Sequence, residues 1–160
     1  MEYRYVESPI GKLLLVGEGE TVHQIGFPSH KGKVTPEDSW HSNQQVLTRL
    51  VSQLEAYFAG KLQKFDLELC PDGTQFQLQV LAALQHIPYG DTRSYADIAR
   101  EIGRPKAVRA VGAANGRNPI PIVIPCHRVI GSNGSLTGFG GGLGTKQFLL
   151  NLESGSRDLF

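Results

Sequence analysis

One short stretch of the sequence places a nucleophile beside two possible cations: Cys126 is followed by His127 and Arg128. A thiolate is the strongest ordinary side-chain nucleophile, and it forms near neutral pH only beside a base or a positive charge. The β-branched residues 122–124 just before it predict a buried strand that ends at the cysteine. The stretch therefore indicates a thiol active site, and a buried structural cysteine beside an incidental histidine is the alternative.

The cysteine and the histidine are neighbours in the chain, and this limits how they could react together. In an extended segment successive side chains point to opposite sides, so a turn or a bridging water would be needed to couple thiol and imidazole. A carboxylate should then fix the imidazole tautomer. Beyond His127 the chain offers Glu153 and Asp158. We favour Glu153, because it stands among leucines on an expected helix, where an acid needs a partner.

The first half of the chain predicts a sheet with one helix and no site of its own. Short strands separated by turn residues indicate an antiparallel meander. The expected strands are residues 3–6, 12–17, 22–27 and 65–69, and a helical period runs from 43 to 60. Pro71-Asp72-Gly73 breaks the pattern. We therefore place a domain boundary there, with 1–70 as a structural subdomain and 71–160 as the functional one.

The second half predicts short helices that begin at capping boxes. Thr74 and Gln77 form one such pattern, and Ser94 and Asp97 form another. A further helix is expected at residues 106–115. Two short helices joined by a Gly-containing turn are typical of a helix-turn-helix, although any helical hairpin would share the pattern.

The helix expected at residues 106–115 has an outer face of unusual composition. Its inward positions follow the spacing of one helical face and comprise Ala107, Ala110, Val111 and Ala114. The opposite face then carries Arg109 with Gly112 and Ala113. Small residues around one long cation permit close approach to another surface, and the minor groove of DNA would suit this arrangement.

Composition and charge exclude several classes of protein. With 160 residues, 40% hydrophobic and 19% charged, the chain is typical of a globular protein of one domain or two small subdomains. The sequence shows neither an apolar run that could cross a membrane nor a signal peptide. With two cysteines and no export signal, we expect free thiols in a reducing cytoplasm. Because these cysteines lack metal-ligand spacing, we expect no metal, and we expect no cofactor either.

The charges are divided unevenly between the halves. The net charge of +1 splits into −2 for residues 1–70 and +3 for residues 71–160. A basic second half favours a polyanionic partner for that half.

Beyond these local patterns, Pro125-Cys126-His127-Arg128-Val129-Ile130 resembles the active-site signature of the O6-alkylguanine-DNA alkyltransferases. The likeness continues through residues 87–90, 94–95, 109–112 and 118–119 to the glycine-rich loop, Lys146 and Glu153. It covers about residues 74–153. It implies an α+β fold, with a ribonuclease H-like N-terminal antiparallel β-sheet with helix and a mostly helical C-terminal winged helix-turn-helix subdomain.

The resemblance implies a catalytic role for each matching residue. Cys126 would accept the alkyl group from O6-alkylguanine in DNA, and also from O4-alkylthymine, irreversibly and once per molecule. His127, oriented by Glu153, would deprotonate the thiol through water. Tyr95 would donate a hydrogen bond or a proton toward N3 of the departing guanine, and Asn118 would support the backbone of the active site.

The same resemblance implies a partner and a pocket. The partner would be double-stranded DNA bearing O6-alkylguanine, bound by a monomer, with the damaged nucleotide flipped out of the stack. Arg109 would fill the gap that the flipped nucleotide leaves. The expected DNA-binding residues are Tyr95, Arg109, Ala110, Gly112, Arg117 and Arg128, and the expected pocket residues are Val129, Phe139, Gly140 and Gly141.

Two departures from some relatives carry expectations of their own. Phe139-Gly140 stands where some relatives carry Tyr-Ser, so hydroxyl hydrogen bonds would be lost while room is gained for larger alkyl groups. The N-terminal metal ligands of some relatives are not evident, so we expect no zinc. A cysteine hydrolase and a non-catalytic sensor of DNA damage are the rival interpretations. A sequence-specific regulator is disfavoured, because the exposed helix face carries few base-reading side chains.

Overall fold

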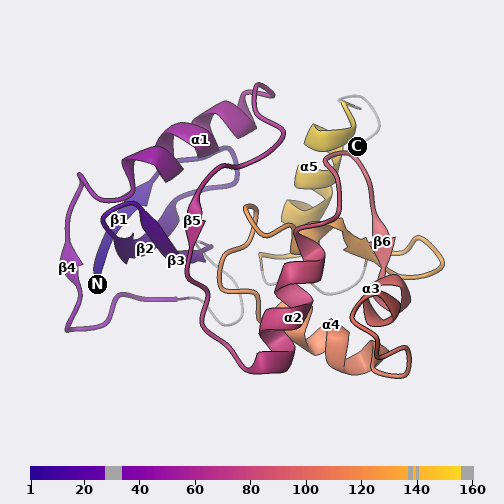
Figure 1. Cartoon of the computed structure of the whole chain (residues 1–160). Coiled ribbons are helices and arrows are strands. Elements are labelled where there is room, and N and C mark those ends of the chain that lie inside the picture. The colour runs from indigo at the N-terminus through magenta and orange to yellow at the C-terminus, as the bar shows by residue number, and fades with distance from the viewer. Residues whose placement is uncertain (28–33, 137–138, 140, 156–160) are drawn as a thin grey trace.

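The structure, a computed structural model, describes residues 1–27, 34–136, 139 and 141–155. A sheet and one helix form the N-terminal half (Figure 1). In the C-terminal half, the other helices of the described residues surround an irregular segment. The N-terminal elements are β1 (Glu2–Val6), β2 (Leu13–Glu18), β3 (Thr21–Gly26), β4 (His41–Ser42), α1 (Thr48–Phe58) and β5 (Glu68–Leu69). The C-terminal elements are α2 (Gln75–Leu84), β6 (Arg93–Ser94), α3 (Tyr95–Glu101), α4 (Val108–Gly116), the 3₁₀ turn η1 (Cys126–Arg128), β7 (Val129–Ile130) and α5 (Leu143–Ser154). The α+β class expected from the sequence is confirmed.

The sheet is built around β2, its central strand, in the order β4-β1-β2-β3-β5. β2 pairs antiparallel with β1 and β3, which confirms the meander. The short edge strands β4 and β5 run parallel to β1 and β3, so the whole sheet is mixed. Every residue from Leu13 to Val16 is buried, so both faces of β2 are covered. At Gly17 the register shifts, and a Cβ there would lie 2.2 Å from the carbonyl oxygen of Thr21, so only glycine lets the two strands close.

α1 begins later than the helix predicted from residue 43. Residues 44–47 form turns, and Leu47 has a left-handed backbone with φ 57°. The Leu47 side chain is fully buried, and its N–H donates to the Gly19 carbonyl at 2.9 Å. Packing against the β2–β3 turn therefore overrides the helical preference of this segment.

The predicted strand at residues 65–69 shrinks to β5, and a side chain of α1 explains why. Gln53 accepts a hydrogen bond from the backbone N–H of Asp66 and donates one to its carbonyl, both at 2.9 Å. Both backbone groups of Asp66 are thus bound to a helix side chain and not to a neighbouring strand.

α2 and α3 begin where the sequence predicts them. In both capping boxes the hydroxyl of Thr74 or Ser94 accepts from a backbone N–H three residues later at 3.1 Å, and the reciprocal bond is present. α2 and α3 both pack on α4, whose buried residues include Val111 and Ala114. Ala110 was expected to face the core but is exposed, since the buried face of α4 comprises Val111, Ala114 and Asn115.

The predicted strand at residues 122–124 is wrong. These residues form turns, and Ile122 has a left-handed backbone with φ 74°. The N–H of Ile124 donates to the Ile120 carbonyl at 2.9 Å, so the chain folds back on itself before the cysteine. A β-branched, apolar run is also what a fully buried turn requires, and periodicity alone does not separate the two.

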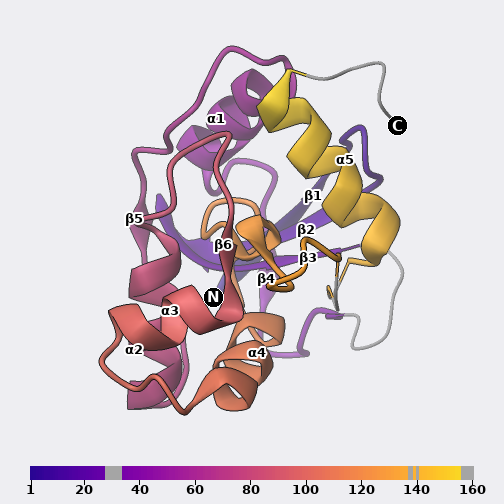
Figure 2. The same ribbon diagram turned by 90° about the vertical axis from the view of Figure 1, so that its right-hand side faces the viewer.

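The two halves share one core. Its buried members come from β2, β3 and α1 as well as from α2, α4, the turn before Cys126 and α5. The N–H of Ile25 on β3 donates to the Pro119 carbonyl at 2.9 Å, which ties the sheet to the segment that leads to the cysteine. α1 and α5 both lie in the upper part of the molecule in the two views (Figures 1 and 2). Among the described residues, the helices are too short or too polar to span a bilayer.

Candidate active site

Cys126 is the first residue of η1 and is nearly enclosed, with 4% of its surface exposed. Burial raises the pKa of the Cys126 thiol to about 11, while Asn118 and Lys146 act in the opposite direction. A neutral thiol is the weaker nucleophile, so reaction needs a base that removes the proton as the substrate arrives.

His127 and Glu153 form a buried pair beside the thiol. The Nε2 atom of His127 lies 2.7 Å from Oε2 of Glu153, and both side chains are shielded from solvent. Burial lowers the pKa of His127, although Glu153 raises it, so the imidazole is neutral at pH 7. The proton of a neutral imidazole facing a carboxylate sits on the shared nitrogen, so Nε2 donates. The other nitrogen, Nδ1, is buried and has no hydrogen-bond partner among the residues that the structure describes. It is therefore free to act as a base.

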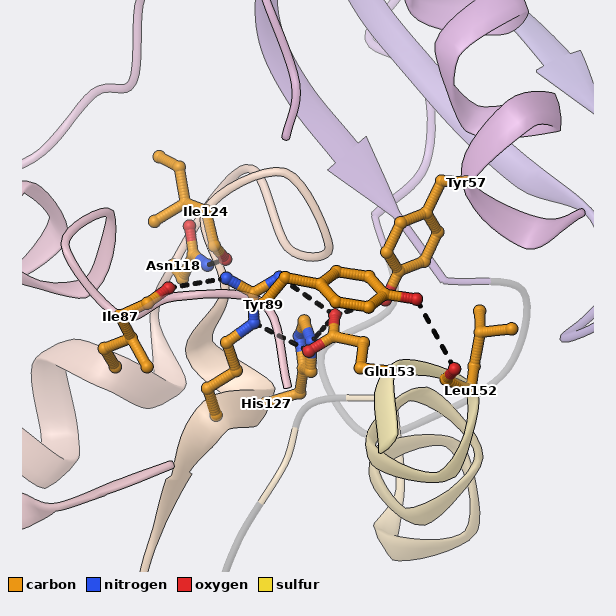
Figure 3. A network of polar contacts seen from close by, with 9 residues as sticks. Tyr57, Ile87, Tyr89, Asn118, Ile124, His127, Leu152 and Glu153 are labelled. Carbon is orange, nitrogen blue, oxygen red and sulfur yellow. Dashed lines mark hydrogen bonds and ion pairs between the residues drawn. The ribbon is translucent and has the colours of Figure 1, made fainter. Parts of the chain in front are cut away.

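Glu153 is held by three side chains, two from η1 and one from α1 (Figure 3). Arg128 donates from Nε to Oε1 at 2.7 Å and from Nη2 to Oε2 at 3.0 Å. The hydroxyl of Tyr57 on α1 lies 2.6 Å from Oε2, the oxygen that also faces His127. Burial by itself raises the pKa of Glu153, but the hydrogen bonds from His127 and Arg128 outweigh it and lower the pKa to about 2. Glu153 is thus a fixed anion.

Arg128 does not lie where a DNA-binding residue would have to lie. Its side chain is only 8% exposed, and besides Glu153 it donates to the Ile87 carbonyl at 2.7 Å. The guanidinium also lies 5.7 Å from the centre of the Tyr89 ring. The expectation of DNA contact is therefore corrected: the buried carboxylate draws this cation inward.

Two asparagines brace the segment that carries the thiol. Asn118 donates from Nδ2 to the Ile124 carbonyl at 2.8 Å and accepts from the Ile120 N–H at 3.0 Å, so it spans the turn before Cys126. Asn115, buried on α4, donates to the Cys126 carbonyl at 3.4 Å. The sequence argument included Asn118 and missed Asn115, although a polar residue next to inward-facing Ala114 was a usable signal.

Lys146 lies fully buried on α5 and donates from Nζ to the Val129 carbonyl at 2.6 Å. It was noted in the sequence without a role. Lys146, Leu149 and Glu153 are spaced to share one face of α5, so the Lys146 cation lies on the same side of the helix as the Glu153 carboxylate. Burial lowers the pKa of Lys146, while Cys126 raises it.

Apart from Arg128, the residues expected to bind DNA are exposed or half-buried on α3 and α4 or next to them. Arg109, Ala110 and Arg117 are exposed on or next to α4. Tyr95, the first residue of α3, lies half-buried across from Gly112, where a Cβ would stand 3.8 Å from the Tyr95 ring. Tyr95 on α3 and Arg109 on α4 are thus long side chains of this surface, and the α4 residues around them are small.

Part of the expected substrate pocket can be followed. Val129 is buried in β7, and the ring of Phe139 lies 5.5 Å from that of Phe27. A Cβ on Gly141 would come within 3.0 Å of Phe27 and 3.1 Å of Phe139, so a side chain there would displace both rings. Gly140 lies outside the described residues. No cluster of three or more histidine, cysteine or acidic residues suited to a metal ion occurs in the described ranges.

Two family models match the chain, and together they span nearly all of it. Residues 1–71 match the ribonuclease-like domain of 6-O-methylguanine DNA methyltransferase, and residues 75–155 match its DNA-binding domain. The chain belongs to the 6-O-methylguanine DNA methyltransferase family. The expected family and its fold are thereby confirmed.

Relatives within this methyltransferase family match over nearly their full length. A methylated-DNA--protein-cysteine methyltransferase of Methanosarcina acetivorans is 54% identical over 153 residues, covering 96% of this chain and 98% of the relative. One from Mycolicibacterium paratuberculosis is 54% identical over 159 residues, with coverages of 96% and 92%. The crystal structure of Mycobacterium tuberculosis OGT in complex with DNA superposes with a TM-score of 0.92 at 49% identity, covering 97% of this chain and 94% of that one.

Proposed function

We propose that this protein repairs DNA by transferring the alkyl group of O6-alkylguanine, and of O4-alkylthymine, to its own Cys126, once per molecule. The observation that carries the proposal is the buried Cys126-His127 pair with Glu153 on Nε2, which leaves Nδ1 of His127 as the base, in a chain of the methyltransferase family. Relatives that share about half of its residues are named methylated-DNA--protein-cysteine methyltransferases.

The proton and the alkyl group move in opposite directions. His127 takes the thiol proton at Nδ1 through a water molecule, and its Nε2–H stays bonded to Glu153, which stabilises the imidazolium that forms. The thiolate attacks the alkyl carbon, the S–C bond forms as the C–O6 bond breaks, and the electron pair leaves with guanine. Tyr95 supports the leaving base at N3, where guanine takes up one proton, and His127 releases to water the proton that it took from Cys126, so the protons balance. The thioether S–C bond is not cleaved by water at neutral pH, so the thiol is not restored and the protein stops after one transfer.

DNA reaches the thiol only if the damaged nucleotide leaves the helix. Guanine O6 lies inside the stacked duplex, whereas Cys126 is 4% exposed. Arg109 on α4 would fill the gap, with the small residues Ala110 and Gly112 allowing close approach to the minor groove and Arg117 contacting the backbone. This proposal gives Arg128 a different role from the one expected, because it holds Glu153.

We further infer a cytoplasmic monomer, divided after residue 70 into a structural and a DNA-binding part. The two free thiols, Cys70 and Cys126, support a reducing compartment. The DNA-binding family model, which begins at residue 75, supports the division.

Turnover separates this proposal from its rivals. The purified protein is incubated with an excess of duplex DNA bearing one O6-methylguanine, and repaired DNA is counted per protein. A plateau at one equivalent supports self-alkylation, more than one equivalent would indicate a hydrolase, and none would indicate a non-catalytic sensor. Cys126→Ala should bind the DNA and repair none of it.

A further inference from the structure

Tyr57 connects the N-terminal half directly to the catalytic carboxylate. It lies near the end of α1, is fully buried, and points from that helix to Glu153 on α5 (Figure 3). Its hydroxyl oxygen is 2.6 Å from Oε2 of Glu153. The residues are 96 positions apart in sequence, so only the fold brings them together.

The direction of this hydrogen bond follows from the charges. Burial first, and then Glu153, raise the pKa of Tyr57, so its hydroxyl stays protonated. Glu153 is ionised and can only accept. Tyr57 therefore donates to the same oxygen that accepts from Nε2 of His127.

The hydroxyl is not needed to fill the core. The Tyr57 ring already packs against the rings of Phe58, Phe65 and Tyr89 at 5.3, 5.4 and 6.3 Å between centres, and phenylalanine would keep these contacts. A buried hydroxyl costs stability unless it is bonded, and this one is bonded to the group that orients the base.

We propose that Tyr57 is a positioning residue of the alkyl-transfer reaction: its hydroxyl fixes the Glu153 carboxylate and withdraws part of its negative charge from His127. The proposal rests on the proposed function. It also revises the expectation that residues 1–70 are purely structural, because one member of the catalytic network comes from α1.

Other charged groups around His127 set the background for this effect. Glu153 and Lys146 act on His127 from α5, and Arg128 acts on it from η1. Tyr57 reaches Glu153 from α1, and Tyr89, in the loop after α2, lies against Arg128. The two cations disfavour a charged imidazole, and Glu153 favours it. The Tyr57 hydroxyl, which donates a hydrogen bond to Glu153, weakens the effect of its negative charge on His127. Like the two cations, it therefore disfavours protonation of His127. Removal of the Tyr57 hydroxyl should therefore make His127 easier to protonate.

The test compares two matched substitutions in the full chain, Tyr57→Phe and Tyr89→Phe. Each removes one buried or half-buried hydroxyl, but that of Tyr89 donates to the Leu152 carbonyl at 3.4 Å and leaves Glu153 untouched. The ring-nitrogen NMR signals of His127, assigned by their loss in His127→Ala, are followed against pH. Single-turnover methyl transfer from duplex DNA is measured at pH 8, and urea unfolding records stability.

We expect Tyr57→Phe to move the protonation midpoint of His127 to higher pH, because Glu153 then acts on His127 with its full charge. Methyl transfer should slow by about tenfold, because the carboxylate that orients His127 is no longer fixed by the hydrogen bond. Tyr89→Phe should change neither. A wild-type midpoint in Tyr57→Phe, or wild-type transfer, would overturn the proposal even if stability fell. If the unmodified protein transferred no methyl group, the proposed function would fail, and the NMR midpoint would still decide whether Tyr57 controls His127.

Discussion

Arg128 donates a hydrogen bond to each carboxylate oxygen of Glu153, from Nε to Oε1 at 2.7 Å and from Nη2 to Oε2 at 3.0 Å. Because this pair is buried, loss of the guanidinium leaves an uncompensated carboxylate in the core. We expect Arg128→Met to lower the free energy of unfolding by about 3–5 kcal/mol, measured by urea denaturation. Arg49→Ala, which removes an exposed pair with Asp66, should cost at most about 1 kcal/mol. Equal losses in the two variants would contradict the assignment.

Acid should destabilise the fold through Glu153 and His127. The pKa of Glu153 falls from 4.5 to about 2 on folding, because hydrogen bonds from His127 and Arg128 outweigh the burial that raises it. Burial lowers the pKa of His127 from 6.5. A group whose pKa is lower in the folded state contributes stability above its unfolded pKa and loses it as the pH falls. Stability should therefore fall from about pH 6.5 downward, with roughly 3 kcal/mol due to Glu153 lost between about pH 4.5 and 2.

The acid effect is measured by urea unfolding across this pH range, with Glu153→Gln as the control. The glutamine protein should be less stable at pH 7 and should lose less stability below pH 5. If both proteins lost stability in parallel below pH 5, Glu153 would not be the titrating group.

Arg109 should matter for DNA and not for the chemistry of the thiol. Arg109→Ala removes the exposed cation of α4, and we expect transfer from duplex DNA to slow by about tenfold or more. Reaction with the free base O6-benzylguanine should be unchanged, because no duplex has to be opened. Arg49→Ala again serves as control, since it removes an exposed arginine from the other half. A parallel loss with both substrates would place Arg109 in the chemical step.

The pocket should accept larger alkyl groups. Phe139 packs against Phe27 and carries no hydroxyl that could bind the base. We expect O6-benzylguanine and O6-butylguanine to react at rates comparable with the methyl lesion in DNA. A Phe139→Tyr/Gly140→Ser double variant should shift the preference toward methyl. Much slower reaction of the benzyl and butyl groups with the unaltered protein would refute this prediction.

Much of the fold was readable because local signals and tertiary packing agree there. The capping boxes at Thr74 and Ser94 satisfy their helices internally, so sequence alone locates both starts. The errors fall where tertiary contacts override local preference. Leu47 and Ile122 are both fully buried and both take left-handed backbones in turns, and hydrophobic periodicity alone does not distinguish such turns from a helix or a strand.

The residues of the candidate site divide in the same way. The residues and the resemblance together indicated Cys126, His127 and Glu153, and the predicted Glu153–His127 contact is present at 2.7 Å. The Tyr57–Glu153 contact was not predicted. Tyr57 occupies a position in the apolar stripe of α1 and therefore reads as core. Arg128 reads as a surface cation, because the sequence does not reveal that an anion is buried beside it.

The central claim is that Cys126 itself becomes the alkyl carrier. The direct test is intact-protein and peptide mass measurement after incubation with duplex DNA containing one O6-methylguanine. We expect the protein to gain the mass of a single methyl group in place of one hydrogen, with the modification on the peptide containing Cys126. Restored guanine with an unmodified protein, or a methyl group on exposed Cys70, would contradict it.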